Sequence, residues 1–203
     1  PPVDVTRTGY YYSALGDLRG ISYHVTVNGR SDPGAFAGSG NALLSRLKPF
    51  KIEHFVLPSR IPGRGVLLAE FANEGLPWNI AVTHLSLSAS ARRVQIAYLA
   101  ELLSDRPRLV LMGDFNCDLL APEMSRLFQF TSLAPPQISL PTFPSWAAKR
   151  PIDHILVGGM ASSQYQTHIA AGSDHLAIAL ELELPEINPV NSPWPKQPVP
   201  AAP

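Results

Sequence analysis

The sequence predicts an α/β fold, a mixed β-sandwich flanked by helices. Stretches of β-branched and aromatic residues recur along the chain, whereas only two segments have helical periodicity. With so few helices between them, most neighbouring strands must be joined directly and run antiparallel. The chain has 203 residues, of which 45% are hydrophobic, so we expect one domain with one substantial core.

The first part of the chain predicts mainly strands. Residues 1–20 have no clear periodicity and are expected to be loop, whereas residues 21–27 (ISYHVTV) suit a strand. The Gly-, Ser-, Asp- and Pro-rich residues 28–40 predict a surface loop. Further strands are predicted at residues 41–45, 51–57, 65–71 and 78–84.

The strongest helix signal follows these strands. Ser90 can serve as an N-cap, and a shorter helix is predicted from Pro122 to about Phe130. The first helix has apolar residues at helical spacing, namely Ile96, Leu99, Ala100 and Leu103. Arg92 and Arg93 fall in its first turn, where the helix dipole disfavours cations by only ~0.3–1 kcal/mol. They either face an anionic substrate or a carboxylate, or are solvated.

The last part of the chain predicts three more strands. Residues 108–112 (RLVLM) indicate a buried strand and residues 152–157 another, with a loop over residues 131–151 between them. In residues 176–184 leucine and isoleucine alternate with alanine and glutamate, which is the period of a strand. Seven of the nineteen residues from 185 to 203 are proline, so we expect a disordered tail after a domain spanning residues 1–184.

The composition excludes several classes of protein. Lys plus Arg equals Asp plus Glu at 16 each, so no overall positive field draws the protein onto nucleic acid. The single cysteine, Cys117, can form neither an internal disulfide nor a cysteine-rich zinc site. No apolar run is long enough to cross a bilayer. We expect a soluble monomer, with a cytoplasmic location favoured although the compartment itself is undetermined.

The most informative segment is LVLMGDFNCD, in which a buried strand leads into Asp114, Phe115 and Asn116. Strand alternation places Asp114 and Asn116 on one side and Phe115 in the core. Such oxygen donors suit Mg²⁺ with its retained waters, or a phosphate held beside the ion. The alternative is an Asx-turn that closes the strand.

Three further strand ends carry reactive side chains. His84 ends one predicted strand, and Asp153 begins an apolar strand where a carboxylate needs a partner. Asp174 and His175 come directly before the last strand. Each has a structural alternative, a histidine of the framework or a solvated loop. Together they favour a site, because loops at strand ends form sites on a rigid scaffold.

The motifs THL, GDFN, IDHI and SDH, in this order, resemble the endonuclease/exonuclease/phosphatase superfamily, also called DNase-I-like. The segments GNALLSR, Arg92-Arg93-x-Gln95 and PTFPSW strengthen this resemblance, which spans residues 38–184. It implies a DNase-I-like mixed β-sandwich and a metal-dependent hydrolase of phosphate esters, foremost a phosphodiesterase or nuclease that uses Mg²⁺, with Mn²⁺ as an alternative. The substrate would be nucleic acid, a phospholipid or an inositol phosphate.

The resemblance also implies catalytic roles. Asp114 and Asn116 would contact the attacking water and the phosphate. His175, oriented by Asp153, would form a histidine–carboxylate dyad, and His84 would be a second histidine facing the phosphate. A carboxylate behind an imidazole fixes its tautomer, which suits proton transfer. Which histidine acts as acid or base stays open.

As metal ligands the resemblance implies Asp114, Asn116 and Asp174. The family normally opens with a strand carrying an Asn and a strand ending in Gln-Glu, whose Glu is the principal metal ligand, and this sequence matches neither. We therefore expect an N-terminally truncated or degenerate domain that lacks two sheet strands. Activity of this 203-residue chain is expected to be weak, since one carboxylate ligand is missing.

Two alternative functions stay open. One is a phosphomonoesterase or lipid phosphodiesterase in place of a nuclease. The other is a catalytically impaired binding or scaffold domain that kept the fold after losing its metal-ligand Glu. A Cys–His hydrolase around Cys117 is disfavoured, because this residue follows an oxygen-rich motif and a free cysteine is usually a small buried hydrophobe.

Overall fold

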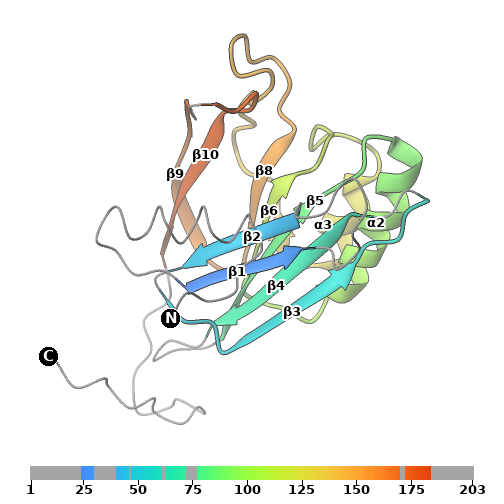
Figure 1. Cartoon of the computed structure of the whole chain (residues 1–203), viewed down its shortest axis with the longest axis vertical. Coiled ribbons are helices and arrows are strands. Elements are labelled where there is room, and N and C mark those ends of the chain that lie inside the picture. The colour runs from blue at the N-terminus through green and yellow to red at the C-terminus, as the bar shows by residue number, and fades with distance from the viewer. Residues whose placement is uncertain are drawn as a thin grey trace, which may run out of the picture.

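The computed structural model describes residues 24–29, 40–45, 47–60, 63–71, 77–169 and 172–183. Within this part of the chain, a six-stranded sheet has helices on one face and two small two-stranded sheets on the other (Figure 1). The predicted mixed α/β sandwich is therefore confirmed. The predictions for residues 1–20, for most of the 28–40 loop and for the tail from residue 185 lie outside the described residues.

The central sheet has the strand order β3-β4-β5-β6-β8-β7. These strands are β3 (Lys51–Val56), β4 (Gly65–Phe71), β5 (Trp78–His84), β6 (Leu109–Asp114), β8 (Asp153–Gly158) and β7 (Leu133–Ala134). Among the described pairs of this sheet, β5–β6 is parallel and the others are antiparallel. A parallel pair needs a long crossover, which here contains a helix. Because β5 and β6 are parallel and in register at His84 and Asp114, they end at the same edge of the sheet.

Helices α2 (Ala89–Leu102) and α3 (Met124–Phe130) pack on one face of the sheet. Alternate strand residues point toward them, as the pleat requires. The resulting core includes the buried residues Val66, Leu68, Leu109, Leu111, Ile96, Leu99, Phe115 and Leu127. Neither described helix is long and apolar enough to span a bilayer.

Both helix starts differ from the prediction. The N-cap of α2 is Ser88, whose Oγ accepts the N–H of Ala91 at 3.3 Å, and Ser90 lies in the first turn. The backbone of Ser88 is extended, as it is in an N-cap. The sequence alone does not show which of two nearby serines has this conformation. Helix α3 begins at Met124 and not at Pro122, because a turn closed by the Met124 N–H and the Ala121 carbonyl precedes it.

Two antiparallel pairs lie on the other face of the sheet. Strand β1 (His24–Gly29) pairs with β2 (Gly40–Ser45), and β9 (Ala161–His168) pairs with β10 (Ala177–Glu183). The Nδ2 of Asn41 in β2 donates to the carbonyls of Gly65 at 2.8 Å and Val82 at 3.1 Å. This one amide therefore ties the second layer to both β4 and β5.

Strands β7 and β9 were not expected from the sequence. Strand β7 falls within residues 131–151, which predicted a loop, and has only two residues. Strand β9 has the sequence ASSQYQTH, and its side chains are mostly exposed. Because it buries no apolar face, it has none of the alternation that reveals a strand. Strand β10, which has that alternation, was predicted within one residue at each end.

Candidate active site

Three neighbouring strands place titratable side chains in one row. His84 ends β5, Asp114 ends β6 and Asp153 begins β8. His84 is in register with Asp114, and Asp114 is in register with Asp153. The parallel pair β5–β6 ends at one edge, and the antiparallel β8 starts there. The sheet topology alone therefore brings together residues that lie far apart in the sequence.

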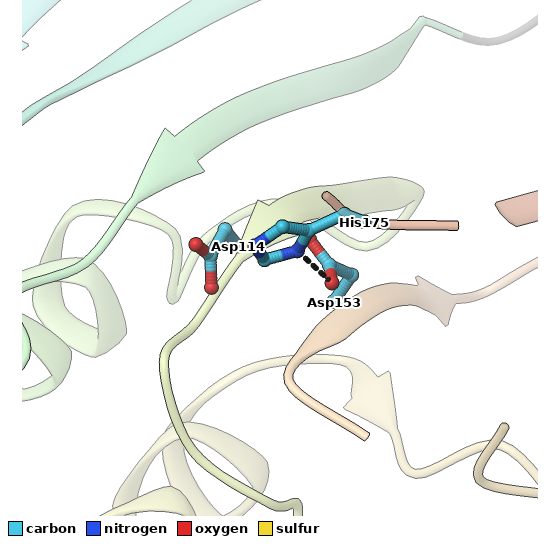
Figure 2. Close-up of side chains that lie close together, drawn as sticks. All are labelled: Asp114, Asp153 and His175. Atoms are coloured by element: carbon cyan, nitrogen blue, oxygen red, sulfur yellow. Dashed lines mark hydrogen bonds and ion pairs between the residues drawn. The ribbon is translucent and has the colours of Figure 1, made fainter. Parts of the chain in front are cut away.

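His175 joins this row from the loop before β10. Its Nδ1 lies 2.7 Å from Oδ2 of Asp153, and Figure 2 shows the ring between Asp153 and Asp114. A carboxylate can only accept, so Nδ1 carries the proton and the second ring nitrogen, Nε2, is not used by Asp153. Thr142 Oγ1 donates to the same Oδ2, and the ring of Phe143 packs against that of His175 with centroids 4.9 Å apart. These contacts fix the orientation of the imidazole.

Asp114 forms the second histidine–carboxylate pair. Its Oδ2 lies 3.2 Å from Nε2 of His84, whose side chain is 44% exposed. Burial by itself raises the pKa of Asp114. Hydrogen bonds from His84 and from the Asn116 N–H lower this pKa, as do the charges of His84 and His175. The lowering effects are larger in sum, so the pKa of Asp114 lies below its ordinary value. Asp114 is therefore a carboxylate at neutral pH.

Asn116 follows Asp114 in a tight turn. Its backbone has φ 53°, and its N–H donates to Asp114 Oδ1 at 2.8 Å, which is the Asx-turn of the alternative interpretation. Its Nδ2 donates to the Leu85 carbonyl at 2.9 Å, and Phe115 is fully buried as predicted. Strand β6 ends at Asp114, so the turn places Asn116, not the strand alternation that the sequence predicted. The Asx-turn and the candidate site are therefore not alternatives, because Asp114 and Asn116 belong to both.

Five of the six predicted residues are linked to one another by hydrogen bonds or strand register, and for the sixth, Asp174, the side chain makes no such link. Within the described residues, the possible metal-binding group consists of Asp114, Asp153 and His175, whose ligand atoms lie within 4.8 Å of one another. Asp174 is exposed and is not in this group, although its backbone carbonyl accepts the Ser145 N–H at 2.7 Å. Within this group Asp153 Oδ2 and His175 Nδ1 bond to each other, whereas the Asp114 carboxylate bonds to His84 and to the Asn116 N–H.

Comparison with known families identifies the chain. The sequence profile of the Endonuclease/Exonuclease/phosphatase family matches residues 3–175. The chain belongs to this family. The resemblance carried by the four motifs is thus confirmed. A comparison with curated proteins gives no significant match.

Several solved structures share the fold of this chain. A functionally unknown conserved protein from Enterococcus faecalis V583 has 22% identity and a TM-score of 0.67, covering 83% of this chain and 80% of that one. The Bacteroides thetaiotaomicron VPI-5482 mannosyl-6-phosphatase Bt3783 has 18% identity and a TM-score of 0.64, covering 86% and 82%. A humanized Danio rerio TDP2 has 17% identity and a TM-score of 0.67, covering 87% and 82%. The DNase-I-like fold of this family is therefore confirmed.

Three residues near the site were not singled out from the sequence. Thr142 and Phe143 lie in the PTFPSW segment that carried the family resemblance, but nothing in that segment indicated their contacts with Asp153 and His175. Arg64 directly precedes β4. Burial lowers the pKa of its guanidinium, and the charge of Asp114 opposes this effect, so Arg64 brings positive charge to the site. A single arginine in a loop gave no sequence signal.

Gly113 is where β5 and β6 approach each other beside the row. It has φ 142°, and a Cβ there would lie 1.8 Å from the Thr83 carbonyl oxygen. We expect Gly113→Ala to lower the free energy of unfolding by about 3 kcal/mol or more, because the main chain of β5 must move. For a chain of this size the midpoint of thermal unfolding, followed by circular dichroism, should fall by roughly 10 °C.

Gly172 is the matched control for this prediction. It also has a positive φ, 79°, but nothing lies within 4 Å of an added Cβ. Gly172→Ala should therefore cost only the left-handed backbone conformation, about 1–2 kcal/mol. Equal losses of stability in the two variants would contradict the claim that the close approach of β5 and β6 requires Gly113.

Proposed function

We propose that this protein is a phosphodiesterase that hydrolyses its substrate with water and uses Mg²⁺ or Mn²⁺. Members of the endonuclease/exonuclease/phosphatase family are generally hydrolases of phosphate esters. The observation that carries the proposal is the row of His84, Asp114 and Asp153, with His175 hydrogen-bonded to Asp153. Two imidazoles and two carboxylates at one sheet edge supply the proton-transfer groups that ester hydrolysis needs.

In this proposal His175 transfers or holds a proton at Nε2. Asp153 holds its Nδ1–H, which fixes the tautomer and leaves Nε2 to face the water or a phosphate oxygen. His84 acts from the other side of Asp114 and stabilises negative charge on the phosphate. Arg64 adds positive charge near Asp114, which favours binding of an anionic ester.

The donor set suits a hard divalent cation. Asp114 supplies an ionised carboxylate, and Asn116 keeps its Oδ1 for a ligand, since its Nδ2 is bonded to the Leu85 carbonyl. Asp174 would have to approach from its exposed position, so its ligand role is supported by the family resemblance alone. When bound, the cation would neutralise negative charge that develops on the phosphate oxygens.

The proposal is tested by measuring hydrolysis of a panel of esters with Mg²⁺, Mn²⁺ or a chelator. The panel comprises bis(p-nitrophenyl) phosphate, plasmid DNA, a sphingomyelin-type lipid, inositol phosphates and p-nitrophenyl phosphate. We expect metal-dependent cleavage of at least one diester and none with the chelator present. Cleavage that persists in the chelator would contradict the metal requirement, and the DNA and lipid arms separate the two classes of diester.

A phosphomonoesterase is the second candidate, because a mannosyl-6-phosphatase has the same fold. Cleavage of p-nitrophenyl phosphate without cleavage of any diester would favour it. A scaffold domain without activity predicts a third result. Calorimetry would then detect no binding of Mn²⁺, whereas both enzyme functions predict binding that depends on the Asp114 carboxylate.

A further inference from the structure

Helix α2 buries two polar side chains on the face that packs against the sheet. Arg92 is 8% exposed and Gln95 is 0% exposed, three residues apart and beside the apolar Ile96. Residues at this spacing lie on the same face of a helix. A buried amide or guanidinium costs free energy unless it is hydrogen-bonded. Their partners therefore indicate what they are for.

Gln95 uses both ends of its amide on a single residue. Its Oε1 accepts the Ser86 N–H at 2.9 Å, and its Nε2 donates to Ser86 Oγ at 2.9 Å. The backbone and the side chain of Ser86 are thereby fixed together. Ser86 lies two residues after His84, in the loop that joins β5 to α2.

Arg92 holds the same loop and also the start of α3. Its Nη1 donates to the carbonyls of Leu87 and, at 3.4 Å, Ser86. Its Nε and Nη2 both lie 2.9 Å from Oε1 of Glu123, which is itself buried. Of the two arginines noted in the sequence, Arg92 thus faces a carboxylate and the loop, whereas Arg93 is exposed.

The first residue of the loop is held from the opposite side. The Leu85 N–H donates to the Asp114 carbonyl at 2.9 Å, and the Leu85 carbonyl accepts from Asn116 Nδ2 at 2.9 Å. The loop is thus fixed to β6 at residue 85 and to α2 at residues 86 and 87. In contrast, the side chain of His84 is 44% exposed, and its Nε2 lies 3.2 Å from Oδ2 of Asp114. Its position relative to Asp114 must depend on the backbone that carries it.

We infer that Arg92 and Gln95 are positioning residues that hold His84 against Asp114 through the 85–88 loop. This inference rests on the proposed function, in which His84 faces the phosphate. Neither side chain needs to touch the substrate. A displacement of His84 of the order of 1 Å would be enough to lower the rate about a hundredfold.

The test compares three substitutions on the same helix face. Gln95→Leu removes both bonds to Ser86 and replaces the amide with an apolar side chain of similar size. Gln95→Glu is the conservative variant, since one carboxylate oxygen still accepts the Ser86 N–H and the other can accept the Ser86 O–H, which reverses the direction of that second bond. Ile96→Val is the matched control, because it loosens the same core without removing any bond to the loop. Circular dichroism confirms that each variant is folded.

Kinetics on the best diester of the panel should separate positioning from a general loss of stability. We expect Gln95→Leu to lower kcat about ten- to a hundredfold with little change in KM, Gln95→Glu to recover most of it, and Ile96→Val to change neither. In a His84→Ala background, Gln95→Leu should have no further effect, because both changes act on the same group. A full additional loss in that background would overturn the inference.

A magnetic resonance experiment decides the inference without any activity. The Cε1–H signal of His84, assigned by its absence in His84→Ala, should shift or broaden in Gln95→Leu and stay unchanged in Ile96→Val. An unchanged His84 signal in Gln95→Leu overturns the positioning role, whatever the kinetics show. If no ester of the panel is hydrolysed, the proposed function fails, while this comparison still decides whether Gln95 positions His84.

Discussion

Replacement of His175 by alanine is expected to lower kcat/KM for a diester about a thousandfold or more, within or above the range of a lost general acid or base. The reason is the arrangement of the ring, whose Nδ1–H is held by Asp153 and whose Nε2 remains for proton transfer. Among the residues that the structure describes, no second imidazole bonds to Asp153. Initial rates on bis(p-nitrophenyl) phosphate at saturating Mg²⁺ or Mn²⁺ would measure the loss.

The control for this variant is His168→Ala. His168 is exposed at the end of β9, opposite Ala177, and plays no part in the row. We expect it to leave the rate and the thermal midpoint unchanged. A His175→Ala protein that retained more than about a tenth of the activity would remove His175 from the catalytic group, since general acid–base catalysis contributes at least about a hundredfold.

The second large effect is expected for Asp114→Asn, which keeps the shape of the side chain but removes its charge. We expect a loss of activity of about 10³-fold or more together with loss of Mn²⁺ binding, because a hard cation needs the ionised carboxylate. Isothermal calorimetry measures the binding and the ester assay measures the rate. Asp118→Asn is the matched control in the same segment, where the Asp118 carboxylate accepts the Leu120 N–H. Normal Mn²⁺ binding by Asp114→Asn would contradict the assignment.

The pH dependence of stability gives the same carboxylate a second test. The folded pKa of Asp114 lies below its ordinary value of 3.8, so ionised Asp114 stabilises the native state above that pH, and the contribution is lost as the pH falls through the lowered folded pKa. Urea unfolding of the parent and Asp114→Asn proteins should therefore differ most near neutral pH. The difference should shrink below about pH 4, where the unfolded state takes up its proton.

Much of the central sheet could be predicted from local pattern. Strands β4 and β5 have the predicted bounds, because continuous apolar runs bounded by breaker-rich segments mark buried strands. Strand β9 could not be predicted, since its polar side chains are exposed and its existence depends on pairing with β10. The same limit applies to the cap of α2, where a serine two residues earlier is used.

The candidate site was partly predictable, because several of its residues lie at the ends of strands that the local pattern reveals. His84, Asp114 and Asp153 each stand at the end of a recognisable strand, so their type and place are visible in the sequence. Thr142 and Arg64 are not, because the hydrogen bond of Thr142 to Asp153 and the charge interaction of Arg64 with Asp114 arise only in the folded chain. The ordering of strands in a sheet decides such contacts, and local sequence carries little information about it.

The row at the edge of the central sheet exists only when several separate elements of the fold are in place. Its members come from β5, β6, β8 and the loop before β10, so no single contiguous fragment shorter than the span from residue 84 to residue 175 contains them all. Opening of any one of these elements, even by a local fluctuation, separates one member of the row from its neighbour. Nascent, nicked or partly melted chains would thus lack the assembled row.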